Sequence, residues 1–330
     1  MTKALPLVSI VTPSFNQGRY IRETIESVLG QTYEAIELHV IDGGSTDETD
    51  EVVSRYRSEL QTYVSEADTG QANAINKGLR LARGSYVMWL NSDDILLPTA
   101  IADVVKVFEQ NPDIDLCHGK SLLFSDQTSK SHIIGAEDNY EEKYAAYMSF
   151  PQPSSFFRTN ILNKIGYLDE TLHFAMDFDF YLRIYLIGNL VYCPSVFSKY
   201  RLHGRSKSND GLSFVSEWKE VFSRFVNSMD FGQETKRSLC EWGLHSGTKV
   251  RYLSDRIISP SLFEKIVFNH LFACANILYR YGDSERAREY LEYAKYYLHT
   301  QYRARGGGQL YLRSYLVPRA LRGLRDRLPR

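Results

Sequence analysis

The sequence predicts an α/β protein whose mainly parallel sheet is flanked by helices and followed by a C-terminal helical appendage. Two observations predict this class. Over the first 120 residues, apolar runs of strand length alternate with segments whose apolar residues recur at helical spacing. After about residue 210 the pattern changes to aromatic-rich segments of helical period alone. A chain of 330 residues can bury a full core in one large domain or in two.

Four strands are predicted in the first 90 residues. Each is a short run of apolar and β-branched residues bounded by polar or turn-forming residues. They cover residues 7–12 (LVSIVT), 36–42 (IELHVID), 61–66 (QTYVSE) and 85–90 (SYVMWL).

A helix is predicted after each of these strands. The apolar faces of the first three consist of Ile21, Ile25, Val28 and Leu29, then of Val52, Val53 and Tyr56, then of Ala74, Ile75, Leu79 and Ala82. The second helix follows the capping residues Ser45, Thr46 and Asp47, and the fourth covers residues 98–111 with Pro98 in its first turn. Strands that alternate with helices pair mainly in parallel, with helices on both faces of the sheet.

Composition and charge narrow the class of protein. Apolar residues make up 43% and charged residues 24%, as in ordinary soluble globular proteins, and the net charge of −1 gives no reason to expect nucleic acid as a partner. Four cysteines without C-x-x-C spacing argue against a structural zinc site or a disulfide framework and fit a reducing compartment. No apolar stretch reaches the about 18 residues that a spanning helix needs, and the N-terminal run is too short for a signal peptide. A cytoplasmic protein is therefore expected.

Clusters of polar residues follow all four predicted strands. They are residues 12–16 (TPSFN), 42–47 (DGGSTD), 66–70 (EADTG) and 91–94 (NSDD). Any one of them could be turn chemistry, because Gly, Asn, Asp and Ser are common in turns. Together they would lie at the carboxyl edge of the sheet, where open α/β sheets bind ligands.

The acidic character of this edge points to a metal ion. The phosphate-binding motifs G-x-G-x-x-G after the first strand and G-x-x-x-x-G-K-[ST] anywhere are absent from the sequence. A phosphate ligand beside carboxylates needs a cation between them, and Mg²⁺ and Mn²⁺ favour carboxylate oxygens together with substrate phosphates. Asp93 and Asp94 are thus interpreted as half of a metal–diphosphate site. The simpler alternative is that they cap the next helix, and one residue can do both.

Four segments carry a resemblance to a known family: VSIVTPSFNQGRYIRETIESVLGQTY, VIDGGSTDETDEVV, DTGQANAINKGLRLARGSYVMWLNSDDILLP and HFAMDFDFYLRI. Over about residues 7–205 the chain resembles glycosyltransferase family 2, whose members share the GT-A fold. The resemblance implies inverting transfer of a sugar from a nucleotide diphosphate donor, with Mn²⁺ or Mg²⁺. It implies a catalytic domain at 1–210, with a nucleotide-binding half at about 1–120 and an acceptor-side half at about 121–210.

The resemblance also assigns residues to the nucleotide-sugar site. Pro13, Ser14 and Phe15 would line the nucleoside pocket, and an Asp there can accept a base N–H or a ribose hydroxyl. Asn73 and Lys77 would lie nearby, although an ordinary helix surface explains them equally well. The full expected set is Pro13, Ser14, Phe15, Asn16, Asp42, Asp68, Asn73, Lys77, Ser92, Arg201 and Arg205. The second strand departs from the family, since many members have Asp-Asp-Gly-Ser where this chain has Asp42-Gly43-Gly44-Ser45.

The metal ligands implied by the resemblance are Asp93 and His203. Asp93 matches the last acid of the Asp-x-Asp signature, whose first position is Asn91 here, a weaker and neutral ligand. Asp94 is expected to start the next helix. For His203, in the segment YRLHGRSKS, a purely structural role is the alternative.

The implied general base is Asp177, which would take the proton of the acceptor hydroxyl. The family's Glu-Asp pair is Met176-Asp177 here, and an N-cap role is the alternative for Asp177. Asp179 is the local competitor and is expected to cap or orient the helix. Gln152 is the expected contact to the acceptor sugar.

The C-terminal third is predicted to be helical at 211–303, with residues 271–298 forming two helices joined at Gly282-Asp283. A basic tail follows at 304–330. The last thirty residues contain eight Arg and one Asp, so they carry +7 and residues 1–300 carry −8. Such a tail can lie on an anionic membrane, which would place the protein peripherally at the inner face of the cell membrane. A solvated tail is the alternative.

The function predicted is glycosyl transfer from a nucleotide sugar, with a UDP-sugar favoured, to a glycan or lipid-linked glycan, in polysaccharide assembly. The alternative is a catalytically impaired nucleotide-sugar binder or a scaffold of a glycan assembly system. Asn91 and Met176 speak for the alternative, whereas the presence of Asp93 and Asp177 speaks against it.

Overall fold

The computed structural model describes residues 4–135, 141–230, 232–297, 305, 307 and 309–310. The chain divides into two compact units. The first consists of Met1–Asn139 and Ser149–Ser206, and the second of Tyr140–Met148 and Lys207–Arg330. The sheet belongs to the first unit, so this unit is described first.

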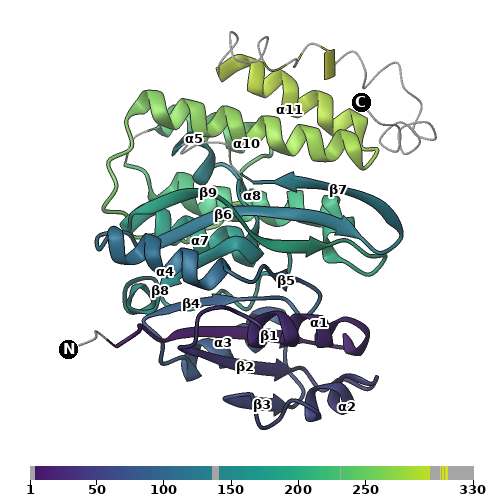
Figure 1. The fold of residues 1–330 in the computed structure, drawn as a ribbon. Helices are drawn as coiled ribbons and strands as arrows, with labels where there is room; N and C mark the ends of the chain where they lie inside the picture. Colours follow the sequence, from purple (N-terminus) through teal and green to yellow (C-terminus); the bar gives the residue numbers. More distant parts are fainter. Residues whose placement is uncertain are drawn as a thin grey trace. The chain divides into compact units, whose positions relative to one another are not determined.

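The first half of the sheet is parallel, as predicted. Its strands lie side by side in the order β3 (Thr62–Ser65), β2 (Ile36–Asp42), β1 (Val8–Ser14) and β4 (Tyr86–Trp89) (Figure 1). β1 and β2 are buried on both faces, and β2 includes two buried polar residues, Glu37 and His39. Pro13 lies beyond the residues of β1 that pair with β4, so its missing N–H removes no bond on that side.

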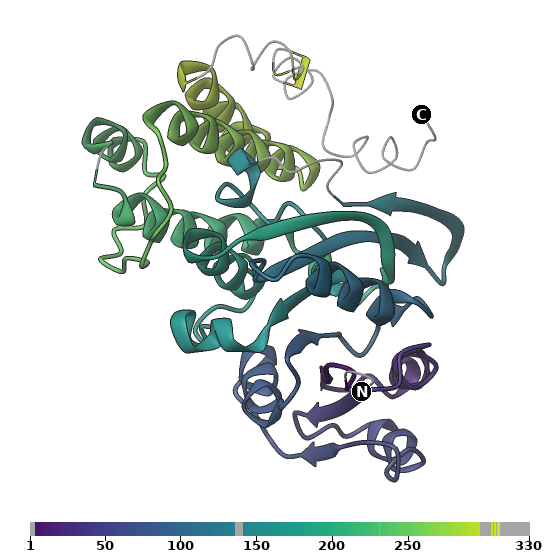
Figure 2. The ribbon, with the colours of Figure 1, turned by 60° about the vertical axis from the view of Figure 1, so that its left-hand side comes forward.

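The second half of the sheet is mixed. β8 (Ser155–Arg158) pairs antiparallel with β4 and β6 (Leu116–Ser125), and β6 pairs antiparallel with β7 (Thr128–Ile134) and parallel with β9 (Leu190–Arg201). β5 (Ile95–Leu96) pairs antiparallel with β9. β6 and β9 run together for most of their length (Figure 2). The direction of the strands changes at β8, which is antiparallel to both of its neighbours. β7 is antiparallel to β6 because a short turn joins them.

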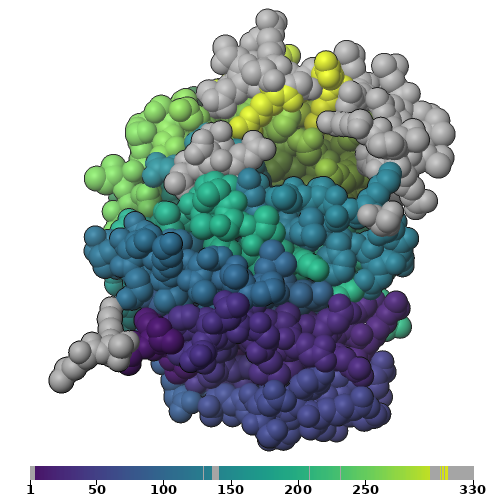
Figure 3. Space-filling model, in the orientation of Figure 1, coloured from purple at the N-terminus to yellow at the C-terminus, as the bar shows by residue number. Residues whose placement is uncertain are grey.

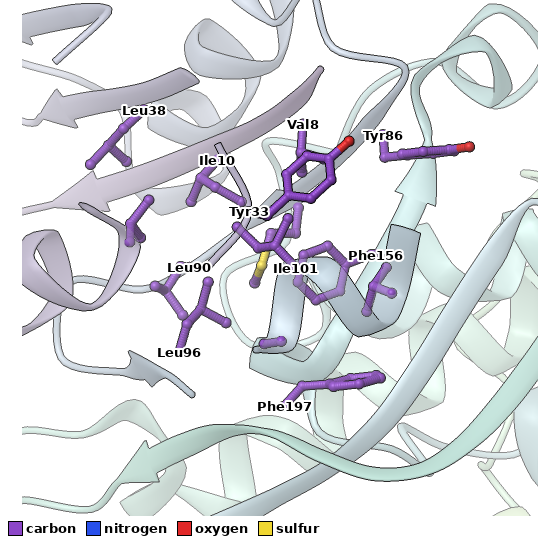
Figure 4. Packing of buried hydrophobic residues seen from close by; sticks show 14 of the residues in the cluster. Val8, Ile10, Tyr33, Leu38, Tyr86, Leu90, Leu96, Ile101, Phe156 and Phe197 are labelled. Atoms are coloured by element: carbon purple, nitrogen blue, oxygen red, sulfur yellow. The ribbon is translucent and has the colours of Figure 1, made fainter. Parts of the chain in front are cut away.

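Helices cover both faces of the parallel half. α1 (Gly18–Leu29), α2 (Thr49–Ser54) and α4 (Ala100–Gln110) pack on the face that bears Val8 and Ile10. Figure 4 shows this core, to which Tyr33, Leu90, Ile101 and Phe156 all belong. α3 (Gln71–Leu81) packs on the opposite face, and the rings of α7 (Met176–Ile187) stack there on Trp89. On the face seen in Figure 3, the purple surface around α1 adjoins the blue-violet surface around α2 and β3.

Two details differ from the sequence prediction. α4 begins at Ala100 with Thr99 before it, so Pro98 is not in its first turn. β5 lies between Asp94 and α4, and therefore the prediction that Asp94 starts that helix is wrong. The remaining short helices of the first unit are η1 (Gln152–Ser154), η2 (Thr159–Ile161) and α6 (Leu162–Ile165).

The second unit is helical in its described residues. It contains α5 (Glu141–Tyr144), η3 (Lys207–Asn209), α8 (Gly211–Ser228), α9 (Gln233–Glu241), α10 (Pro260–Arg280) and α11 (Ser284–Tyr297). α10 and α11 are the two helices that the sequence predicts, and Gly282, at a φ of 91°, lies in the turn between them. Ser259 caps α10 by accepting a hydrogen bond from the amide of Leu262. Within the described residues, no helix is both long enough and apolar enough to span a membrane.

Candidate functional site

The polar ends of the parallel strands meet at one edge of the sheet. The register pairs Ser14 at the end of β1 with Asp42 at the end of β2, and Asp42 with Ser65 on β3. The NSDD segment directly follows β4, which neighbours β1. This edge is where the sequence predicts the ligand site.

The loops after β1 and β2 are joined by hydrogen bonds. Asn16, which has a φ of 53°, donates its amide to the Ser45 hydroxyl (2.7 Å) and accepts from the Thr46 amide through Oδ1 (2.9 Å). Asp47 accepts from the amide of Gly18, the first residue of α1 (3.0 Å). These bonds hold Asn16 in the left-handed conformation, which is uncommon outside glycine. Phe15 beside it is 60% exposed, an unusual setting for an aromatic ring.

Asp42 is 1% exposed, and its carboxylate is surrounded by donors of the protein. Its Oδ2 accepts from the amides of Gly44 (3.2 Å) and Ser45 (2.9 Å) and from the Ser65 hydroxyl (2.8 Å). The Ser45 hydroxyl donates to Oδ1. Asp42 therefore fixes the shape of the loop that carries Ser45 and Thr46. Ser14, its neighbour on β1, is buried, and its hydroxyl has no hydrogen-bond partner among the described residues.

Asp68 occupies the space above Gly43. A Cβ added to Gly43 would lie 2.6 Å from Asp68 Oδ2, so a side chain at this position would collide with the carboxylate. Asp68 Oδ1 accepts the amide of Gly70 (2.8 Å). Many family members have a second Asp where this chain has Gly43. Here the carboxylate of Asp68, from the loop after β3, occupies the space that a side chain at position 43 would need.

Asn73 and Lys77 on α3 both contact acidic side chains. Lys77 forms an ion pair with Glu66 (2.7 Å), at the end of β3. The Asn73 side chain donates to Glu170 (2.8 Å), which also accepts from Asn76 (2.8 Å). These two hydrogen bonds lower the pKa of Glu170. In this structure the two residues order the loops around the edge of the sheet.

Asp93 and His203 lie together after β4 and β9. His203 Nε2 is 3.0 Å from Asp93 Oδ2, and the side chains of His203 and Asp93 are 7% and 18% exposed. The amide of Arg205 donates to His203 Nδ1 (3.3 Å), so Nε2 is the nitrogen directed at Asp93. The ring of His203 stacks on Tyr20 (4.7 Å). Ser92, between Asn91 and Asp93, is buried.

In this structure a hydrogen bond joins the pair: because Nδ1 accepts the amide of Arg205, Nε2 carries the ring proton and donates it to Asp93 Oδ2. A divalent cation held by both side chains would replace this hydrogen bond, and Nε2 would give up its proton. A carboxylate oxygen and an imidazole nitrogen suit Mn²⁺, and Mg²⁺ commonly uses one or two protein carboxylates plus phosphate oxygens. The described residues contain no group of three or more His, Cys, Asp or Glu side chains that could hold a metal ion. A cation held here would therefore take two ligands from the described residues, Asp93 and His203.

Arg201, which the sequence predicts to bind the nucleotide-sugar donor, is 2% exposed, and its guanidinium group pairs with acidic side chains of the protein. Its Nε donates to Asp93 O (2.9 Å), its NH2 group to Glu23 (3.0 Å), and its NH1 group to Asp126. Its backbone amide donates to Asp94 Oδ1 (3.0 Å). Arg205, the second predicted cation, is exposed.

Asp94 is fully buried beside Asp93. Burial and the neighbouring charge of Asp93 raise the pKa of its carboxyl group well above the usual range. Besides the Arg201 amide, it accepts from the side chain of Asn91 (3.4 Å), and its carbonyl accepts from the Thr24 hydroxyl (2.8 Å). Asp94 thus ties the end of β4 to β9 and α1.

Asp177 lies in the first turn of α7, where the unpaired amides of a helix favour a carboxylate. It is half-buried, and its Oδ1 accepts the amide of Phe178 (2.7 Å). Asp179, the competitor, is 1% exposed and forms an ion pair with Arg183 (2.8 Å). This ion pair lies within α7, and Arg183 also donates to the carbonyls of Ile165 and Tyr167 outside the helix. Asp177 is the more accessible acid of the two.

Gln152, predicted as an acceptor contact, is 8% exposed. Its Nε2 donates to the carbonyl of Trp89 (2.6 Å), and its Oε1 accepts from Asn91 (3.1 Å). Sequence reasoning missed this contact and two others: Gln71 with Asn91 (2.8 Å), and Tyr20 with His203. No spacing of residues in the sequence predicts these contacts, because the two residues of each contact come from different elements.

Comparison with known proteins identifies the family. The model of Glycosyl transferase family 2 matches residues 9–176, just over half of the chain. An uncharacterized glycosyltransferase of Methanocaldococcus jannaschii is 30% identical over 278 residues, which cover 80% of this chain and 93% of that protein. An uncharacterized glycosyltransferase of Rickettsia prowazekii is 28% identical over 260 residues, which cover 76% and 78%.

Solved structures confirm the predicted GT-A fold. S. aureus TarS 1-349 in complex with UDP-GlcNAc has a TM-score of 0.59 at 18% identity, over 94% of this chain and 92% of that chain. Mannosyltransferase PcManGT from Pyrobaculum calidifontis, in complex with GDP-Man and Mn²⁺, has a TM-score of 0.56 at 19% identity, over 99% and 89%. At these identities the likeness concerns the fold alone. The family match and the Methanocaldococcus relative show that this chain belongs to glycosyltransferase family 2.

Proposed function

We propose that the chain transfers a sugar from a nucleoside diphosphate donor to a hydroxyl group of a glycan or lipid-linked glycan, with inversion at the anomeric carbon. The observation that carries the proposal is the Asp93–His203 pair at the carboxyl edge of the parallel strands, 3.0 Å apart and partly accessible. A UDP-sugar is the first candidate donor because TarS was solved with UDP-GlcNAc, and a GDP-sugar is the comparison because PcManGT was solved with GDP-Man.

Asp93 and His203 would hold Mn²⁺ or Mg²⁺. The bound cation would offset the negative charge that develops on the leaving diphosphate. Arg205 is the exposed cation nearest in sequence to His203, and we assign it to the diphosphate. Because the guanidinium of Arg201 already has acidic partners, we propose that it positions Asp93 and does not contact the donor.

The nucleoside would bind over the loops after β1, β2 and β3. The exposed ring of Phe15 offers a stacking surface for the base, and Pro13 and Asn16 shape the loop around it. The hydroxyl of Ser14 and Oδ2 of Asp68 would receive hydrogen-bonding groups of the nucleoside. Asp42, Asn73, Lys77 and Ser92 would support the pocket from behind, since they are buried or bonded to protein groups.

Asp177 is the proposed general base. In a single displacement, the acceptor oxygen attacks the anomeric carbon as the bond to the diphosphate breaks, and Asp177 takes the proton of the hydroxyl group. The carboxylate must be ionised before the attack, and its place in the first turn of α7 favours that form. Gln152 would order the acceptor-side segment, because its buried amide already has protein partners.

A screen of donor hydrolysis and thermal shift against UDP-, GDP-, dTDP- and CDP-sugars tests the proposal, with Mn²⁺ and with EDTA. Metal-dependent hydrolysis of one donor is expected. Binding of a nucleotide sugar without turnover, also in the presence of glycan acceptors, would instead favour the nucleotide-sugar binder or scaffold.

We further propose that the protein works in polysaccharide assembly at the cytoplasmic face of the membrane. The support is the basic amphipathic composition of the tail at 304–330, most of which lies outside the described residues. The second unit consists of Tyr140–Met148 and Lys207–Arg330, and we propose that residues 211–303 form the helical appendage of the catalytic domain.

A further inference from the structure

We infer that Asn91 is a positioning residue that links the metal-binding segment after β4 to the acceptor-side segment at η1, and that it does not ligate the metal. This inference rests on the proposed function for its catalytic consequence. Its structural part rests on a chain of hydrogen bonds whose directions are fixed by the atoms that form them.

The chain of hydrogen bonds starts at the carbonyl of Trp89, which can only accept. Gln152 must therefore present its amide nitrogen to it, at 2.6 Å. This leaves Gln152 Oε1 directed at residue 91, which must donate. Asn91 does so through Nδ2 (3.1 Å), and its remaining oxygen accepts from the side chain of Gln71 (2.8 Å).

The same Asn91 nitrogen faces the buried carboxylate of Asp94 at 3.4 Å. Asp94 is 0% exposed, and a carboxylate at position 91 would have no proton to donate to it. A carboxylate at position 91 would also have no proton to give to Gln152. Gln152 cannot rotate its amide to compensate, because its oxygen would then oppose the Trp89 carbonyl.

The chain of hydrogen bonds also accounts for the departure from the family signature. The oxygen of Asn91 that would ligate a metal is engaged by Gln71, from the first turn of α3. The indole of Trp89 is 1% exposed and stacks on Tyr181 of α7 at 5.3 Å, which makes the support of Gln152 rigid. Asn91 therefore connects four elements of the first unit: β4, α3, η1 and the loop before β5.

The test compares two isosteric substitutions in the full chain. Asn91→Asp replaces an amide with a carboxylate, and Asp93→Asn replaces a carboxylate with an amide. Asn91→Asp should lower the unfolding temperature in EDTA by at least about 4 °C, because it removes the donor to Gln152 Oε1 and puts a carboxylate oxygen in its place. Calorimetric titration with Mn²⁺ alone should show no tightening of the dissociation constant. Asp93→Asn should instead weaken Mn²⁺ binding at least about tenfold, since it removes the proposed ligand.

The kinetic readout separates positioning from a general loss of stability. The assay uses the nucleotide sugar that the wild-type chain hydrolyses, at a temperature where the variant is folded. Asn91→Asp should lower kcat about 10- to 100-fold and leave the KM for this nucleotide sugar unchanged. Tightening of Mn²⁺ binding tenfold or more, with an unchanged unfolding temperature, would show that residue 91 lies in the metal shell and would overturn the inference. The unfolding and Mn²⁺ measurements need no turnover, so they remain decisive if the wild-type chain proves inactive and the proposed function fails.

If Asn91→Asp does not fold, a double-mutant cycle replaces it. Asn91→Ala, Gln152→Ala and the double variant should show losses of unfolding free energy that are clearly less than additive, because both residues act through one hydrogen bond. Additive losses would overturn the link between the two segments.

Discussion

Asp177 and Asp179 lie in the same helical turn but differ in burial and in the groups they contact. Asp179 is buried in an ion pair with Arg183, whereas Asp177 is half-buried. We therefore expect Asp177→Asn to lower kcat about 100- to 10,000-fold, the range that general base catalysis contributes. Calorimetry with the nucleoside diphosphate and Mn²⁺ should give the wild-type affinity. Near-normal turnover of this variant would show that another group is the base.

Asp93 is the residue on which the metal proposal depends. Asp93→Ala should weaken binding of the nucleoside diphosphate at least about tenfold in Mn²⁺, because it removes the carboxylate that we propose holds the cation. In EDTA the variant and the wild type should bind equally weakly. An unchanged affinity in Mn²⁺ would remove Asp93 from the site.

At the scale of elements, α3 packs against β1 through a glycine. A Cβ at Gly78 would lie 2.3 Å from Val11 Cγ1, well inside van der Waals contact. Gly78→Ala should therefore lower the free energy of unfolding by about 1–3 kcal/mol, despite the higher helix propensity of alanine. Gly204→Ala is the matched control, because a Cβ there meets no atom within 4 Å. Urea unfolding measures both variants, and equal stabilities would refute the close approach.

A buried acid joins β2 to the end of α3. Glu37 is 4% exposed and accepts from the Ser9 hydroxyl (2.7 Å) and from the Arg83 amide (2.6 Å) and guanidinium (2.9 Å). Burial alone would raise the pKa of Glu37, but these hydrogen bonds and the neighbouring imidazole of His39 (3.3 Å) outweigh it and lower the pKa to about 2. The ionised form is thus favoured by folding.

The stability that Glu37 contributes should depend on pH. Because its pKa is lower in the folded state than the ordinary 4.5, the contribution is complete above about pH 4.5 and disappears as the pH falls toward 2. Glu37→Gln should accordingly be less stable than the wild type at pH 7, by about 2 kcal/mol. The difference in unfolding free energy should shrink at pH 3, and a constant difference would contradict the assignment.

At the scale of the whole molecule, the chain combines a catalytic fold with a basic C-terminal end. Arg305 donates to Asn269, so a deletion that spares this contact begins at residue 311. Removing residues 311–330, which contain six arginines and one aspartate, should reduce partition onto anionic vesicles and leave donor hydrolysis unchanged.

Replacing the six arginines of the same segment by glutamine separates charge from apolar contact. It should reproduce most of the loss on anionic vesicles, because each cation near such a surface contributes about 1 kcal/mol. Equal vesicle binding by the deletion variant and the full chain would exclude the tail as an anchor.

The sequence by itself determined the order of the first strands and helices and the polar residues at their ends. Apolar periodicity and turn chemistry are local properties, so residues such as Val8, Ile10 and Asp42 reveal their element without knowledge of the fold. The mixed second half of the sheet was harder to predict from the sequence, because the pairing of β6 with β8 and β9 joins segments far apart in the chain.

Only the tertiary structure decided which of the predicted site residues are engaged by the protein itself. Arg201 is bonded to Glu23, 178 residues away, and Asn91 to Gln71 and Gln152, 20 and 61 residues away. A sequence pattern shows that a side chain can donate or accept, but the partner that uses this capacity is brought near by folding. For this reason Asn91, which looked like a weakened metal ligand in the sequence, is in the folded chain a donor that a carboxylate could not replace.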